Sequence, residues 1–158
     1  MLDDYRLSAQ DKLDATAVFV LRLGLTWFIF VWAVNKVLTP GQYQQLVRHF
    51  EKAEIATSQV LLIAGIQIFI CVLAFVGIAR LFAYSALLIM HFFTVMRRWE
   101  KFLDPFEINE RGFPINRNAV IDLAVLAAFV ALILLIRRDH FSIGGWLARH
   151  SGERRWWH

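Results

Sequence analysis

Cysteine is almost missing from this sequence, which contains only Cys71 among its 158 residues. A single thiol excludes an intrachain disulfide and a CxxC redox pair, so thiol–disulfide chemistry within the chain is excluded. Because Cys71 lies inside a long apolar run, we expect it to pack as a small buried hydrophobic residue. Proline is also scarce, with three in the chain, so helices can run far without interruption.

The motifs that usually carry catalysis are missing as well. The spacings HxxxH, ExxH and CxxC, which would group metal ligands, do not occur, and neither does a glycine-rich phosphate loop or a nucleophile elbow. Haem bound between helices needs histidines on facing spans, and only His91 lies within an apolar run. We therefore expect no metal site and no intrinsic cofactor, and the catalytic residues stay unknown.

Long runs of apolar residues are the most abundant feature of the sequence. Hydrophobic residues make up 58% of it, charged residues 19%, and the mean hydropathy is +0.51. A helix needs about 20 mostly apolar residues to cross roughly 30 Å of hydrocarbon. Runs near this length occupy residues 16–38, 57–79, 81–96 and 119–136. The sequence therefore predicts one all-α domain over residues 1–158, an integral membrane four-helix transmembrane bundle.

The connections between these runs predict the topology. Pro40 and Gly41 end the first run, and the tight Gly77–Arg80 turn makes the second and third an antiparallel hairpin. Between them, Gln42–Ala56 has the apolar spacing of an amphipathic helix on the membrane surface. Four spans place both termini on one side. The basic, Trp-rich tail favours the cytoplasmic side, and the acidic leader favours a retained first helix over a cleaved signal.

The net charge of +4 does not indicate nucleic acid. Lysines and arginines stand beside the apolar runs, where they hold helix ends near anionic headgroups. We therefore expect the lipid bilayer and membrane proteins as partners, and no nucleic acid.

Four polar residues inside the runs are candidate substrate-binding groups: Lys36, Gln67, His91 and Asp122. A central charge costs roughly 2.5–3.5 kcal/mol on insertion scales, so the position of such residues is informative. By helical rise, Lys36 lies ~3 Å, Asp122 ~5 Å and His91 ~8 Å from the same membrane face, with Gln67 beneath them. These residues either bind a polar ligand head, or Lys36 and Asp122 form a structural ion pair, or they make no contact.

Arg22 is a further charge within the first run, ~9 Å from its start. Two interpretations are open: Arg22 pairs with Asp139, or its long stem carries the guanidinium up to the headgroups. Both roles are structural, and they are favoured over substrate binding, which is the remaining alternative.

The Arg97–Asn118 loop is the main candidate for partner binding. Trp99, Phe102, Phe106 and Phe113 alternate in it with charged residues, and two prolines impose turns. The pattern predicts either a loop that caps the polar layer or docks a partner, or an aromatic-anchored loop at the membrane interface.

Several short motifs stand at the ends of the runs: Arg22-Leu-Gly24 with Lys36 and Pro40, Gly77-Ile-Ala-Arg80, Asn116 with Asn118, and Phe141–Trp146. With these motifs, spread over most of residues 20–147, the chain resembles the DoxX-like (DoxD-related) membrane proteins. The resemblance implies a four-helix fold in the bacterial inner membrane and an association with quinone-linked oxidation. That family often has a carboxylate where this chain has Gln67.

The expected function is therefore that of a redox-associated, quinone-linked subunit or accessory protein. Lys36, His91 and Asp122 are the groups expected at the quinone head, with Trp32 and Phe92 beside it. The alternative is a non-catalytic scaffold that assembles a larger membrane complex through its helices and its loop. Whether the chain is an enzyme stays open.

Overall fold

The structure, a computed structural model, describes residues 7–110 and 112–150. The part of the chain that it describes is all-helical, as the sequence predicts. Six α-helices and two short 3-10 helices follow one another: α1 (Ala9–Leu38), α2 (Pro40–Glu51), α3 (Thr57–Val76), α4 (Arg80–Met96), η1 (Trp99–Phe102), α5 (Arg117–Leu134), η2 (Ile136–Arg138) and α6 (Ile143–His150).

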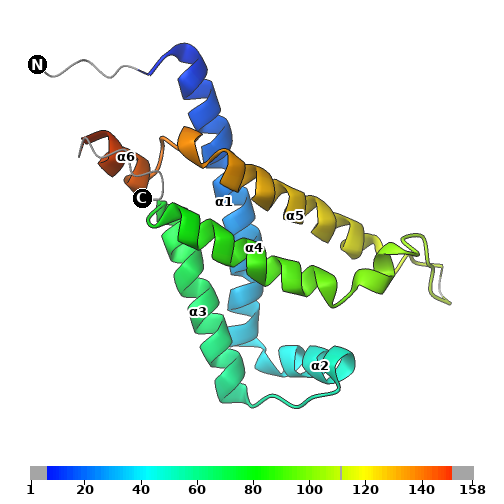
Figure 1. Ribbon diagram of the computed structural model, residues 1–158. Coiled ribbons are helices and arrows are strands. Elements are labelled where there is room, and N and C mark those ends of the chain that lie inside the picture. Colours follow the sequence, from blue (N-terminus) through cyan, green and yellow to red (C-terminus); the bar gives the residue numbers. More distant parts are fainter. Residues whose placement is uncertain (1–6, 111, 151–158) are drawn as a thin grey trace, which may run out of the picture.

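The four long helices are arranged as two crossed pairs. Figure 1 shows α1 beside α3, and α4 beside α5, with the second pair running across the first. The α3–α4 turn joins the pairs at the position where the sequence predicts a tight connection. We call the end formed by the start of α1, the α3–α4 turn, η2 and α6 the terminal end. The end formed by α2, η1 and the loop before α5 is the loop end.

Local sequence signals explain where the helices begin and end. The Ser8 hydroxyl accepts a hydrogen bond from the Asp11 amide at 3.1 Å, so α1 begins at Ala9, before its apolar run. Pro40 opens α2 because a missing amide hydrogen costs nothing in the first helical turn. Gly77 ends α3 with a left-handed backbone, at φ 72°, which suits a residue without Cβ.

The core lies where the two pairs cross. Its fully buried side chains come from all four long helices, and they include Val18, Tyr84, Leu87 and Phe129. Cys71 is buried among them, as predicted from its apolar surroundings. The core thus holds the pairs together near their middle, while polar residues gather toward the ends.

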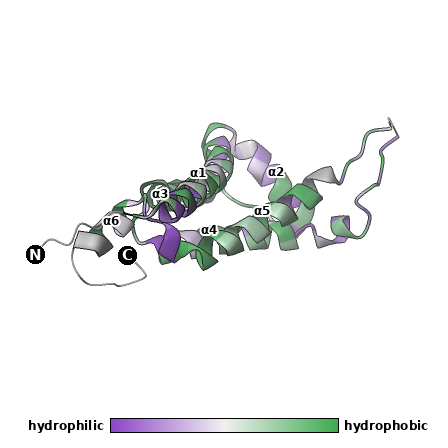
Figure 2. Ribbon diagram, turned by 90° about the horizontal axis from the view of Figure 1, so that it is seen from above, coloured by the Kyte–Doolittle hydropathy of each residue, from purple (hydrophilic) through white to green (hydrophobic). Residues whose placement is uncertain are grey.

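Two helices, α1 and α3, are long and apolar enough to cross a membrane. The helix α4 and residues 119–134 of α5 are apolar as well, but they are shorter. Figure 2 shows hydrophobic residues along most of these four helices, and hydrophilic ones in α2 and in the loop that follows α4. The four predicted apolar helices are therefore present, and two of them have the length of a span.

Candidate functional site

Lys36 and Gln67 meet at the loop end of the first helix pair. The Lys36 ammonium, from the last turn of α1, donates to Oε1 of Gln67 in α3 at 2.9 Å. It also lies 5.1 Å from the centroid of the Tyr43 ring, which α2 brings over it. Lys36 is half-buried and Gln67 buried, so this ammonium keeps some access from outside while one N–H is held by an amide oxygen.

His91 is buried between α1, α4 and α5. Only 3% of its surface is exposed, and its ring packs against the rings of Phe28 and Phe129. Its Nε2 lies 2.9 Å from the backbone carbonyl oxygen of Asp122. Because a carbonyl only accepts, Nε2 is the nitrogen that carries the hydrogen. His91 therefore holds the first turns of α5 against α4.

Asp122 has an ion-pair partner that the sequence did not point to. Its Oδ2 accepts from Nη2 of Arg98 at 2.6 Å, just beyond the end of α4. The pair is largely shielded, with 28% and 11% of the two side chains exposed. Together with the His91 contact, it joins α4 and the residues just after it to the first turns of α5.

The possible Lys36–Asp122 ion pair is therefore not formed. The depth of the two residues along their helices was compatible with a pair, but depth does not specify the direction in which a side chain points. Lys36 turns toward α3, against which α1 packs most extensively, and Asp122 turns toward the end of α4. The four predicted substrate-binding residues thus separate into two clusters, Lys36 with Gln67 and His91 with Asp122.

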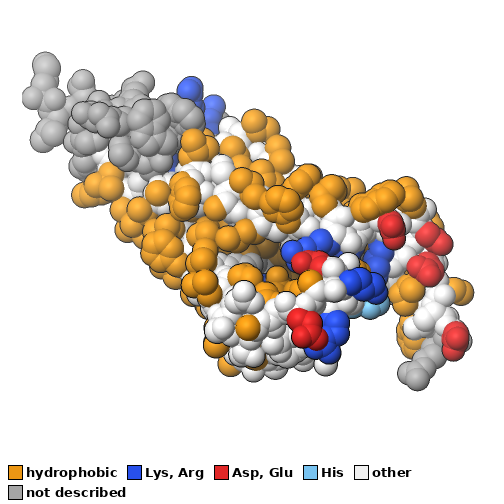
Figure 3. All heavy atoms as spheres, turned by 60° about the horizontal axis from the view of Figure 1, so that its bottom comes forward, with side chains coloured by type: hydrophobic (Ala, Val, Ile, Leu, Met, Phe, Trp, Pro, Cys, Tyr) orange, Lys and Arg blue, Asp and Glu red, His pale blue; other side chains and the backbone are white. Residues whose placement is uncertain are grey.

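The loop end carries most of the exposed charge. Ion pairs join α2 to its surroundings there: Arg97 with Glu51 at 2.7 Å, and Arg48 with Glu54 at 3.4 Å. Figure 3 shows lysine and arginine side chains beside acidic ones on part of this face, while hydrophobic side chains cover most of the remainder. This face therefore combines mutually compensating charges with a large apolar surface.

The loop between η1 and α5 is fastened from within. The Asn116 side-chain amide donates to the Asp104 carbonyl at 2.8 Å and to the Glu107 carboxylate at 2.7 Å. The Phe113 amide donates to the Asn109 side chain at 2.9 Å, close to the bridge that pairs Ile108 with Pro114. These bonds give the loop a defined shape although it lacks regular secondary structure.

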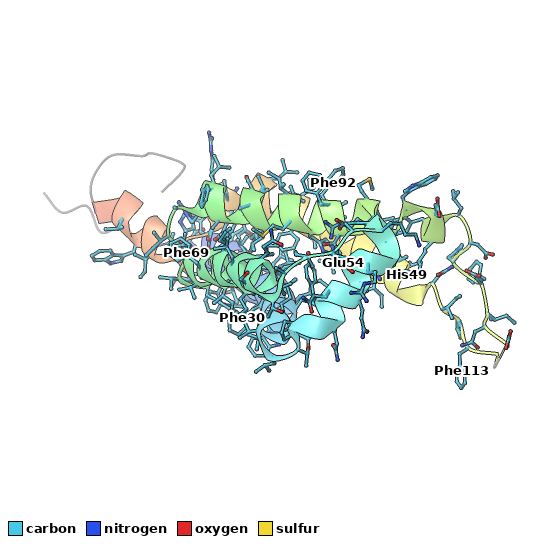
Figure 4. The ribbon with its side chains drawn as sticks, turned by 90° about the horizontal axis from the view of Figure 1, so that it is seen from below. Phe30, His49, Glu54, Phe69, Phe92 and Phe113 are labelled. Atoms are coloured by element: carbon cyan, nitrogen blue, oxygen red, sulfur yellow. The ribbon has the colours of Figure 1, made fainter. Side chains whose placement is uncertain are left out.

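Its aromatic side chains face outward. Phe106 is 86% exposed and Phe113 65% exposed; Trp99 is also exposed, and Phe102 is half-buried. Figure 4 shows Phe113 at the far tip of the loop, whereas Phe92 projects from the outer side of α4. The predicted partner-binding residues therefore present an apolar surface on a shaped loop.

A third polar cluster, at the terminal end, is more deeply buried. Nη1 of Arg22 lies 2.8 and 2.9 Å from the two carboxylate oxygens of Asp139, and Nη2 donates to the Phe141 carbonyl at 2.7 Å. The Tyr84 hydroxyl donates to the same carboxylate at 2.6 Å. Of the two interpretations left open for Arg22, the structure has the ion pair with Asp139.

Arg80 completes this cluster. Its Nη1 donates to the carbonyl oxygens of Asp139 and Ile136, at 2.8 and 3.2 Å, and so binds the first residue of η2 and the residue that follows its end. Tyr84 had no predicted role. One signal was present: Tyr84 follows Arg80 by four residues, so both lie on one face of α4.

Within residues 7–110 and 112–150, no group of three or more His, Cys, Asp or Glu side chains is placed to hold a metal ion. Comparisons of the chain with protein-family models, with curated proteins and with solved structures found no match.

Proposed function

We propose that this chain is a four-span protein of the bacterial inner membrane, in which α1, α3, α4 and α5 cross the bilayer. The observation that supports this most is the apolar exterior of these helices. Their exposed large side chains include Trp27, Leu62, Phe69, Phe82, Phe93 and Leu134. Soluble monomers rarely expose so large an apolar surface, whereas lipid tails solvate it without cost.

The lengths of α4 and α5 are compatible with spans in a locally adapted bilayer. The 17 residues of α4 rise by about 25 Å, somewhat less than the hydrocarbon thickness. Short spans are accommodated by thinning of the bilayer and by long flanking side chains, at a modest cost per ångström. Arg97 and Arg98 follow α4 directly, and η2 continues α5 as far as Arg138.

Within the membrane, the chain serves as an accessory subunit that docks a membrane-protein partner through the loop at residues 97–116. The support is the pairing of a fastened loop backbone with outward Phe106 and Phe113. A preshaped aromatic surface loses little entropy on binding, and aromatic residues commonly dominate docking energies.

The second candidate is a quinone-linked redox role, in line with the resemblance to DoxX-like proteins. A specific observation favours Lys36 as its centre. The half-buried ammonium donates to Gln67 at 2.9 Å and, over a longer distance of 3.5 Å, to the Trp32 backbone carbonyl, and it lies 5.1 Å from the centre of the Tyr43 ring. Its third N–H is suited to the carbonyl of a quinone head beside that aromatic ring. His91 supports the helices in this proposal, because its Nε2 is already bound to α5.

Purification in mild detergent, with mass spectrometry of retained proteins and quinone, tests both roles. In the docking role, Phe106→Ala with Phe113→Ala releases the partner, while Phe69→Ala, an equally exposed aromatic on α3, retains it. In the quinone role, Lys36→Met loses quinone but keeps the partner, and Lys52→Met, an exposed lysine after α2, loses neither. If the loop variant keeps every partner, docking through the loop is wrong; if wild type holds no quinone, the redox role is wrong.

A further inference from the structure

Three elements of the fold converge on the carboxylate of Asp139. Arg22 reaches it from α1, Tyr84 from α4, and the residue itself follows η2. Arg22 is 1% exposed and Asp139 is 0% exposed, so both charged side chains are shielded from water. Such a pair is costly to desolvate, and each partner depends on the other once it is buried.

We propose that the segment Ile136–Trp146 is a strap that locks the helix pairs together by neutralising Arg22. The guanidinium sits within the apolar part of α1, where a lone charge is strongly disfavoured. Its counter-ion is 117 residues away in the sequence and is delivered only when the strap is seated. The first long helix is therefore stabilised in its place by a segment that lies far from it in the sequence.

The strap is seated by a second set of contacts over the α3–α4 turn. The Gly144 amide donates to the Gly77 carbonyl at 2.9 Å, and Arg80 binds the Asp139 carbonyl at 2.8 Å. The Ser142 hydroxyl donates to the same carbonyl at 2.8 Å and accepts from the Gly145 amide at 3.0 Å. Through these bonds the strap fastens to α4 and to the α3–α4 turn as well as to α1.

Neighbouring Arg138 provides a matched control for the buried pair. It also links the strap to α1, through Asp14 at 2.9 Å and Asp11 at 3.3 Å, but half of its side chain is exposed. Exposed ion pairs contribute little to stability, because water solvates either partner when the other is removed. If the buried charge holds the strap, substitution of Asp139 or Arg22 should destabilise the protein strongly, and substitution of Arg138 should have very little effect.

Thermal unfolding of the full-length protein in detergent micelles tests whether the strap stabilises the fold through the Arg22–Asp139 pair. We expect Asp139→Leu and Arg22→Met each to lower the unfolding midpoint by about 10 °C, since each leaves a buried polar partner without its counter-ion. The double variant Arg22→Met with Asp139→Leu should regain at least half of that loss, and Arg138→Met should shift the midpoint by less than about 3 °C.

Hydrogen exchange distinguishes an opened strap from general destabilisation. In Asp139→Asn, amides of residues 140–147 should exchange at least about tenfold faster, while those of α3 keep their protection. Tyr84→Phe, which removes one hydrogen bond and no charge, should show a smaller increase in the same segment. If the single variants do not fold, the proposal is still tested by whether the double variant regains a folded, thermally stable state. Additive losses in the double variant, or unchanged exchange in residues 140–147, would overturn the proposal.

Discussion

At Gly77, the backbone conformation and the close packing both require a residue without a Cβ. Its φ of 72° lies in the left-handed region, which side chains with a Cβ disfavour by roughly 1–2 kcal/mol. An added Cβ would also collide with the Cβ of Ser142 and lie 2.8 Å from Nη1 of Arg22. Since both neighbours belong to the buried cluster, neither can move without disturbing it. The strap and the turn therefore require glycine here.

We predict that Gly77→Ala lowers the free energy of unfolding by about 2 kcal/mol or more, because conformational strain and steric overlap add. Gly24 is the matched control: it lies inside α1 and has open space where a Cβ would stand. Gly24→Ala should be neutral or stabilising by up to about 1 kcal/mol, since alanine favours helix. Thermal unfolding in micelles measures both; equal losses at the two glycines would contradict the close approach at Gly77.

At the scale of elements, the pairing of α4 with α5 depends on contacts near the loop end. Arg98 and Asp122 form an ion pair of 2.6 Å, and His91 binds the backbone of the same Asp122. In the first pair, Lys36 and Gln67 join α1 to α3. Each helix pair thus has its own polar link, and the proposed quinone contact uses only the link in the first pair.

A double-mutant cycle should separate these links. We expect Arg98→Met and Asp122→Leu to show a coupling energy of about 1–3 kcal/mol, because the two side chains are in contact and mostly shielded. The cycle of Lys36→Met with Asp122→Leu should be additive within about 0.5 kcal/mol, because these residues have different partners. Chemical unfolding in micelles gives the four free energies of each cycle. Strong coupling between Lys36 and Asp122 would show that the two clusters act as one.

At the scale of the whole molecule, the distribution of polar and apolar residues indicates how the proposed membrane protein is oriented relative to the bilayer. Among the described residues, most charged side chains lie at the terminal and loop ends, and Figure 2 shows mainly hydrophobic residues along the long helices between these ends. A body of this kind is solvated well by a bilayer whose headgroups meet the two ends. The proposed spans therefore place the loop end and the terminal end on opposite sides of the membrane.

Cysteine labelling tests this orientation in a Cys71→Ala background, which removes the buried native thiol. With termini inside, a membrane-impermeant maleimide should label Phe106→Cys in spheroplasts without permeabilisation. Leu147→Cys, at an exposed position of α6, should react only after the membrane is opened. Both positions are exposed in the fold, so the difference measures sidedness rather than burial. Labelling of both from one side would contradict the four-span topology.

Several features of the fold could be predicted from local sequence alone. Apolar runs located the four long helices to within a few residues, except that α1 extends upstream to Ala9. Gly77 and Pro40 predicted the turns, because they act on the backbone at their own positions. The burial of Cys71 followed from its apolar neighbours. Function remained an inference from resemblance, because no catalytic spacing occurs in the sequence.

The sequence by itself determined an all-helical, strongly apolar chain with a few polar residues inside its apolar runs, because composition and periodicity are local properties. Only the tertiary structure decided which polar groups meet. Lys36 had two partners within reach by depth, and the rotation of α1 toward α3 selected Gln67 over Asp122. Asp139 reached Arg22 and Tyr84 because the chain turns back after α5. Such choices depend on how the helix pairs cross and rotate, which the pattern along a single helix does not specify.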